Sequence, residues 1–219
     1  MRTFILALSI TTLLLGCASE EGQPPTDTVI EADVPEVDPT PQSAVTKRLS
    51  VDMLEDSLAI VAGTDEKNNP IQWQVTYLNK TFLAFGQLGT TLGRPDYAEL
   101  TSENLEPNAL YIKFVGDMAI NVCGKILQAD QKKSDASDRV MTRFIGSGDP
   151  SNEANLLDNL RYLKLRFLAE KVADDDDAGV ADLKVVYDQA HADAASEKST
   201  AGWNAVCVAL FNSPSFHLY

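Results

Sequence analysis

Basic residues are scarce in this chain. Its 219 residues include 18 Lys and Arg against 32 Asp and Glu, which gives a formal net charge of −14. A surface of that sign repels phosphate backbones, so the sequence argues against a nucleic-acid partner. Long apolar runs are also missing. After the opening of the chain, no run reaches the ~18 residues of a membrane span, which excludes a polytopic membrane protein.

The motifs of common catalytic and cofactor sites are absent from the sequence. There is no phosphate loop, no Gly-x-Gly-x-x-Gly, no Gly-x-Ser-x-Gly and no Cys-x-x-Cys-His. There are only two histidines, so a zinc site would need them with carboxylates or thiolates. We expect His191 near a helix end, at the surface or its boundary, and His217 in a poorly held chain end. The sequence indicates no cofactor, no metal and no catalytic residues.

The acidic run Asp174–Asp177 is the one sequence feature that suggests calcium. An EF-hand loop starting there would place Ala178 and Val185 where oxygen ligands are required. We expect instead that Asp177 caps the next helix and that its acidic neighbours favour the positive helix start.

The chain opens with a segment that resembles a bacterial lipoprotein signal sequence. A basic start and a short apolar stretch lead into Leu14-Leu15-Gly16-Cys17, which resembles a lipobox. We predict a signal peptide over 1–16 and Cys17 as the lipidated first mature residue. Ala18 after it favours the outer membrane over the inner, on the periplasmic face. An uncleaved anchor and an ordinary signal peptide are the alternatives.

Residues 17–46 are predicted to be the lipidated Cys and an extended tether. The segment 18–46 holds five of the ten prolines, seven acids and no Lys or Arg. Prolines interrupt helices and sheets, and like charges repel, so such a segment stays solvated.

Residues 47–219 are predicted to form one all-α domain of six to eight helices. Ser50 is a helix cap before a stripe at Val51, Leu54, Leu58 and Val61 that Gly63 ends. Apolar and polar residues alternate over 71–77, which predicts a short strand or an extended strap on the core. The spacing of Phe82, Phe85 and Leu88 predicts a short helix. Further apolar stripes lie at Val140, Met141, Phe144 and Ile145, then over 156–168, 180–190 and 203–211.

The helix expected from Pro107 to about Gln128 is apolar over more than half of its circumference. A helix of that kind lies at the centre of a fold. We place its end before a polar stretch, 129–138, which is typical of a loop. Nothing in that stretch suggests a perturbed pKa for Asp130 or Asp135.

Basic residues gather in one predicted helix of this acidic chain: Arg161, Lys164 and Arg166, with Lys171 after them. They are candidates for a face that binds an acidic partner. The alternative is a solvated helix face that balances neighbouring acids.

Three strings resemble a family. They are the opening from Lys47-Arg48-Leu49-Ser50 to Asp56-Ser57-Leu58, in which Arg-Leu is followed by the first helix, then Leu92-Gly93-Arg94-Pro95-Asp96-Tyr97, and the ending from Ala201-Gly202-Trp203 to Asn212-Ser213-Pro214-Ser215-Phe216. Together they resemble a bacterial domain of unknown function found near the C-terminus of large secreted proteins with a cytochrome-c-like module. The resemblance covers 47–219 in patches, and this chain lacks the cytochrome module. It implies a helical domain that works beside other secreted proteins, and it supplies no catalytic residues.

Arg94, in the second of these strings, is a further candidate interaction residue. A guanidinium fork on a tight loop can clamp carbonyls or carboxylates of a partner, or it can tie the fold together internally.

Two functions follow as hypotheses. The first is a non-enzymatic, lipid-anchored helical module that binds a secreted protein partner in the cell envelope. The second is an accessory subunit or enzyme of an envelope redox or degradative system with a non-covalent cofactor.

The two remaining cysteines, Cys123 and Cys207, lie on the core sides of their predicted helices. An exported domain meets an oxidising compartment, so we predict one disulfide that ties the last long helix to the central one. Two buried free thiols are the alternative.

Overall fold

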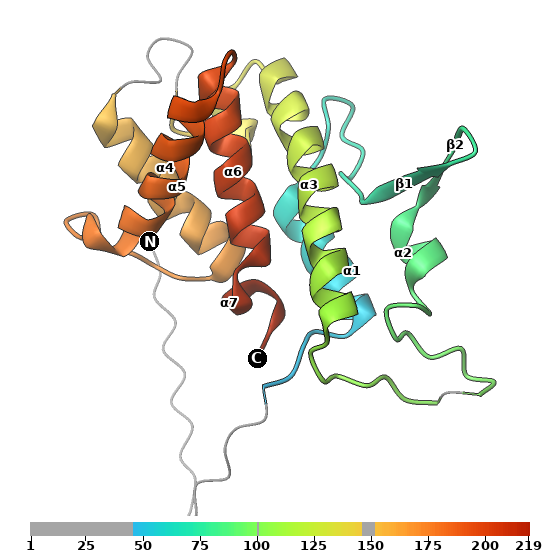
Figure 1. Cartoon of the computed structure of the whole chain (residues 1–219). Coiled ribbons are helices and arrows are strands. Elements are labelled where there is room, and N and C mark those ends of the chain that lie inside the picture. Colours follow the sequence, from blue (N-terminus) through green and yellow to red (C-terminus); the bar gives the residue numbers. More distant parts are fainter. Residues whose placement is uncertain (1–45, 100, 146–151) are drawn as a thin grey trace, which may run out of the picture. The chain divides into compact units, whose positions relative to one another are not determined.

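The structure, a computed structural model, describes residues 46–99, 101–145 and 152–219. Within these ranges the chain forms seven α-helices, two 3₁₀ turns and one β-hairpin, which confirms the predicted all-α domain (Figure 1). The predicted signal peptide, Cys17 and all but the last residue of the predicted tether lie outside the described residues. None of the helices in the described ranges has the length and apolar character of a membrane span.

The elements follow one another in this order: α1 (Val51–Ala62), β1 (Gln74–Tyr77), β2 (Lys80–Leu83), α2 (Ala84–Leu88), α3 (Ala109–Lys132), η1 (Ala136–Asp138), α4 (Glu153–Leu168), η2 (Ala178–Val180), α5 (Ala181–Asp193), α6 (Lys198–Asn212) and α7 (Pro214–His217).

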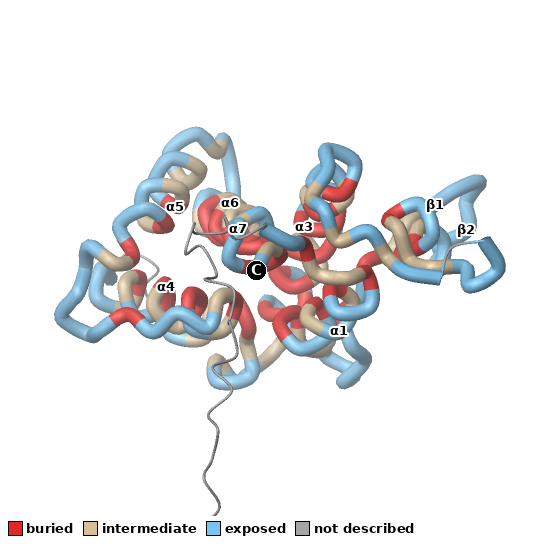
Figure 2. The backbone as a smooth tube through the Cα atoms, turned by 90° about the horizontal axis from the view of Figure 1, so that it is seen from below, coloured by how far each residue is buried: buried red, intermediate tan, exposed pale blue. Residues whose placement is uncertain are grey.

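The central helix is α3, as its wide apolar arc predicted. It packs against α1 and α6, and its buried residues include Tyr111, Met118, Val122 and Ile126 (Figure 2). The helix begins two residues later than expected because the Asn108 side chain accepts a hydrogen bond from the Tyr111 amide at 2.9 Å. It also continues to Lys132, so the prediction of a loop from residue 129 was wrong.

Helix α1 begins and ends where its capping residues predicted. The Ser50 hydroxyl accepts from the Met53 amide at 3.2 Å, which satisfies one of the free donors of the first turn. Gly63 follows the helix with φ +70°, a conformation that glycine adopts without strain.

The hairpin is the principal departure from the expected elements. The predicted strand is present as β1, but Phe82 lies in a second strand, β2, rather than in a helix, and α2 starts only at Ala84. The two-residue turn is Leu78-Asn79, with φ of 48° and 61°. Hairpin turns of this kind favour glycine, and a left-handed Leu costs about 1–2 kcal/mol. Asn79 is a common residue in such a turn, but Leu78 at the first turn position is not, which explains why the second strand was missed.

The apolar stripe from Val140 to Ile145 is not helical. Val140, Met141 and Ile145 are buried, but the segment that carries them is irregular. Its backbone amides are satisfied by side chains of the neighbouring helices α3 and α4, and this replaces the hydrogen bonds that a helix would supply.

The C-terminal end of the chain is held firmly, contrary to expectation. Tyr219 exchanges two backbone hydrogen bonds with Lys47, at 2.8 and 2.9 Å, and the Leu49 amide donates to the His217 carbonyl at 2.9 Å. Phe216 packs edge-on against Phe211, with ring centroids 5.0 Å apart. His217 is therefore buried in the core rather than loose at a chain end.

Candidate functional site

The predicted disulfide is present. Cys123 on α3 and Cys207 on α6 are bonded, with their Cα atoms 5.8 Å apart. Both residues are buried, and the bond joins the two helices that form the centre of the domain. This pair is therefore a structural element that fixes α6 on α3.

The three basic residues of α4 turn toward the domain rather than away from it. Arg161, with a side chain only 10% exposed, pairs with Asp158 at 2.9 Å and with Asp177 at 2.5 Å. Lys164 is buried and lies 3.3 Å from a carboxylate oxygen of Glu170. All three cationic groups are occupied within the fold, because Arg166 also has internal partners.

Arg166 caps the end of another helix. Its Nε donates to the Val61 carbonyl at 3.0 Å, and one of its terminal nitrogens donates to the Ile60 carbonyl at 3.3 Å. These are carbonyls of the last turn of α1, where a cation is favoured by the helix dipole. The residue ties α4 to α1.

Arg94, like Arg166, makes its contacts within the domain. It lies 2.7 Å from a carboxylate oxygen of Asp52 and 2.7 Å from one of Glu55, and it donates to the Phe85 carbonyl at 3.1 Å. The guanidinium thus joins its own loop to α1 and α2. The clamp that the sequence indicated acts on groups of this chain.

Arg48 holds the same loop from the inside, a role that the sequence did not reveal. It is 1% exposed, donates to the carbonyls of Leu92 and Asn104, and pairs with Glu103 at 2.6 Å. Gly93, at φ +104°, leaves room for it, because a Cβ there would lie 2.8 Å from an Arg48 nitrogen. The string that resembles a family motif is thus explained by an internal contact.

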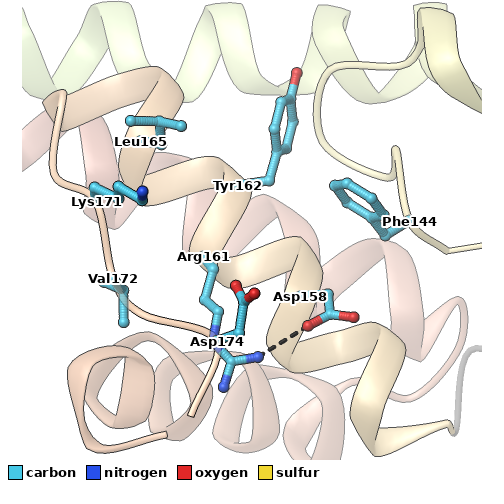
Figure 3. Close-up of a pocket in the computed structure, with 8 residues that line it drawn as sticks. All are labelled: Phe144, Asp158, Arg161, Tyr162, Leu165, Lys171, Val172 and Asp174. Carbon is cyan, nitrogen blue, oxygen red and sulfur yellow. Dashed lines mark hydrogen bonds and ion pairs between the residues drawn. The ribbon is translucent and has the colours of Figure 1, made fainter. Parts of the chain in front are cut away.

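The candidate functional site is an open groove along the outer face of α4, which we call the α4 groove. Its volume is about 410 Å³. Figure 3 shows Phe144 on one side of the helix and Lys171 and Val172 on the other. The lining residues are Phe144, Asp158, Arg161, Tyr162, Leu165, Lys171, Val172 and Asp174.

The floor and one wall of the α4 groove are apolar and aromatic. Leu165 is 51% exposed on the floor, and Phe144 is 47% exposed on the wall. Phe144 meets the Tyr162 ring edge-on at 5.8 Å, and the guanidinium of Arg143 lies 5.4 Å from the centre of the same ring. Aromatic rings with an open edge are the groups that most often anchor a protein interface.

The wall that carries Phe144 is fixed by two buried polar residues. Asp130 accepts hydrogen bonds from the amides of Val140 at 2.8 Å and Met141 at 2.6 Å. Asn159 donates to the Met141 carbonyl at 2.6 Å and accepts from the Phe144 amide at 3.1 Å. The groove is therefore preformed.

Asp130 was expected in a solvated loop with an ordinary pKa, and that expectation was wrong. The residue is 2% exposed within α3. Burial raises the pKa of its carboxyl, and the amide hydrogen bonds from residues 140–142 act in the opposite direction. Its role is to hold the loop before α4. Sequence periodicity could not have found it, because no local pattern tells which single Asp is buried.

Some charged residues of the α4 groove are paired and others are not. Arg161 is neutralised by its two carboxylates, whereas Lys171 and Asp174 are exposed and have no hydrogen-bond or ion-pair partner among the described residues. Lys171 therefore offers a free cation beside an apolar floor.

The acidic run 174–177 acts only in part as predicted, because Asp176 rather than Asp177 accepts a hydrogen bond from the start of the next helical turn. Asp177 makes no capping hydrogen bond and pairs with Arg161 instead, and the Gly179 amide donates to Asp176 at 3.0 Å. In the ranges that the structure describes, no three His, Cys, Asp or Glu side chains gather in a way that could hold a metal ion. His191 is half-buried near the end of α5, as expected, and stacks on Tyr187 at 5.7 Å.

Comparison of the chain with protein-family models, with curated proteins and with solved structures found no match.

Proposed function

We propose that this protein is a lipid-anchored module of the bacterial cell envelope that binds a partner protein through the α4 groove. The observation that carries the binding role is the groove itself. It combines exposed apolar side chains with a wall held in place by buried hydrogen bonds. Such a surface loses little conformational freedom on binding, so more of the interaction free energy remains as affinity.

The chemistry of the groove defines the segment that fits it. An apolar side chain of the partner would cover Leu165 and Phe144, and each Å² of apolar surface removed from water contributes roughly 25 cal/mol. A carboxylate of the partner would meet Lys171, the free cation of the groove. We propose a partner segment with an apolar residue followed or preceded by an acidic one.

The anchor is supported by the sequence. The lipobox-like string ends at Cys17, and the proline-rich acidic segment that follows it is suited to be an extended link between a lipid anchor and a folded domain. Placement on the periplasmic face of the outer membrane rests on Ala18.

The test compares two variants that each place a charge on an exposed apolar residue. Leu165→Glu alters the floor of the α4 groove, and Val185→Glu alters the outer face of α5, where Val185 is 67% exposed. Envelope proteins are crosslinked to each form and identified. We expect Leu165→Glu to lose a partner that the wild type and Val185→Glu both retain. A partner set that is the same in all three forms would contradict the proposal.

A further inference from the structure

The β1–β2 hairpin presents an apolar tip that nothing in the described domain covers. Leu78 is 77% exposed and Tyr77 is 71% exposed, and Phe82 and Leu83 of β2 are also exposed. Successive strand residues face opposite sides, so Phe82 shares the face of Tyr77 and Leu83 lies on the other face. A single exposed apolar residue is ordinary, but neighbouring ones such as Tyr77 and Leu78 at the tip mark a contact surface. Figures 1 and 2 both place this hairpin at the opposite end of the described domain from α4.

The base of the hairpin is fixed, so the tip is held outward. Trp73 is buried against Phe85 and Phe114, with ring centroids 5.3 and 6.1 Å apart. The Gln74 amide donates to Asn121 of α3 at 3.2 Å, and Lys125 of α3 donates to the Gln72 carbonyl at 2.9 Å. The strands themselves pair in register from Gln74 with Leu83 to Tyr77 with Lys80.

The turn keeps an apolar side chain where a glycine would be less strained. Leu78 has φ 48° and still points its side chain to solvent. A bulky residue in the left-handed region is uncommon, and strain of this kind collects at sites of contact.

The charge around the hairpin differs from that of the rest of the chain. Residues 67–95 form the longest stretch without Asp or Glu, and they contain Lys67 and Lys80, whereas the whole chain carries −14. The third cation of this stretch, Arg94, is neutralised by Asp52 and Glu55 of α1. Lys80 lies opposite Tyr77 at the tip. An aromatic residue, an aliphatic residue and a lysine together are the composition of a membrane-interface contact.

We infer that the tip of the β1–β2 hairpin inserts into the headgroup region of an anionic lipid bilayer. The acid-free hairpin faces the bilayer, and the acidic remainder of the domain is repelled from it, so the electrostatics favour one orientation. The contact adds to the proposed lipid anchor and is measured separately from it.

The experiment uses the full-length protein in vesicles of phosphatidylethanolamine and phosphatidylglycerol. A nitroxide is attached at residue 78 through Leu78→Cys, and at residue 185 through Val185→Cys as the control. Collisions with oxygen, which concentrates in bilayers, are compared with collisions with a water-soluble nickel complex. We expect the label at 78 to collide more with oxygen and less with nickel than the label at 185. Equal behaviour at the two positions would overturn the inference.

A second measurement needs no label. Acetylation of Lys80 by a water-soluble reagent should slow several-fold when vesicles are added, whereas acetylation of Lys171 should not change. Leu78→Gly relieves the left-handed turn and removes the apolar side chain, so it should fold and should abolish the protection of Lys80. Reaction of wild-type Lys80 at one rate with and without vesicles would overturn the inference, and so would protection that appears only when envelope proteins are added.

The outcomes separate this inference from the proposed anchor. The intact mass of the protein from membranes reports whether Cys17 carries acyl chains. Protection of Lys80 in a protein that carries no acyl chains would contradict the proposed anchor and support the hairpin contact. An acylated chain with unprotected Lys80 would do the reverse.

Discussion

His217 is buried close to Tyr111, with ring centroids 5.8 Å apart. Burial lowers the pKa of the His217 imidazole below its ordinary 6.5, and a hydrogen bond with the Asn212 backbone opposes that shift. The unfolded chain therefore binds the proton more readily than the folded protein does. The stability that the neutral imidazole contributes is complete above about pH 6.5 and is lost as the pH falls toward the folded-state pKa.

The lowered pKa of His217 predicts how the stability of the domain changes in mild acid. His217→Phe should remove the part of the stability loss that occurs just below pH 6.5. Urea midpoints measured from pH 7.5 down to pH 5 test this. A wild-type midpoint that rises on acidification in that window would contradict it, as would equal slopes for wild type and His217→Phe.

Tyr111 and Asp130 are two other buried residues, and in both burial raises the pKa. Burial raises the pKa of the Tyr111 phenol to about 12, with the Arg48 guanidinium 4.7 Å above the ring acting against the shift. In both residues the environment favours the neutral form, and in both the side chain supports structure rather than lining the α4 groove.

At the scale of elements, the packing of α5 on α6 depends on one glycine. A Cβ at Gly202 of α6 would lie 2.6 Å from a ring carbon of Tyr187 on α5, whereas a Cβ at Gly124 of α3 would have nothing within 4 Å. Gly202→Ala should cost about 1–3 kcal/mol because the tyrosine ring must shift. Gly124→Ala should gain about 0.5–1 kcal/mol. Unfolding free energies that change in the same direction in both variants would contradict this account.

The disulfide between α3 and α6 gives the second prediction at this scale. It closes a loop of 84 residues, so its removal enlarges the unfolded ensemble. Replacing both Cys123 and Cys207 by Ala should lower the free energy of unfolding by about 2–4 kcal/mol. Reduction should destabilise the wild type and leave the double variant unchanged. Alkylation of the unreduced, denatured wild type should add nothing to its mass at these two positions, and two adducts would contradict the bond.

The elements that the sequence predicted are those with a regular pattern. The arc of α3, the cap and stripe of α1 and the closing helix follow from residue spacing alone, because burial of one helix face imposes that spacing. The second strand of the hairpin was missed because Leu78-Asn79 is not a usual turn pair. The segment from Val140 to Ile145 was misread because apolar burial does not require a helix when Asp130 and Asn159 satisfy the backbone.

The candidate site was foreseen only in part. Arg161 was singled out by its charge and does line the α4 groove, but its inward pairing with Asp177 depends on a contact between segments that no local pattern encodes. Phe144 was assigned to a core stripe, and Leu165 and Tyr162 were not singled out. Their exposure follows from how α4 docks against its neighbours, which is a property of the packed domain.

At the scale of the whole molecule, helix α4 and the β1–β2 hairpin lie at opposite ends of the described domain (Figures 1 and 2), and the α4 groove is lined largely by residues of α4 and of the segment after it. A hairpin held against a bilayer would therefore leave the groove directed away from the membrane. A preformed binding surface in that position would be open to a second protein of the envelope.

The proposed anchor gives the last prediction. Cys17→Ala removes the acylation site, and even a single acyl chain gives only marginal attachment, so the few exposed side chains of the hairpin tip should not hold the protein alone. We therefore expect the Cys17→Ala protein to leave the membrane fraction in high salt, with the melting temperature of the domain unchanged. Fractionation followed by thermal unfolding of the released protein measures both. Retention of the Cys17→Ala protein in the membrane fraction would contradict the prediction, and adding Leu78→Gly would identify the cause. Release of the double variant would assign the retention to the hairpin. Continued retention, together with an N-terminus at Met1, would assign it to an uncleaved signal peptide.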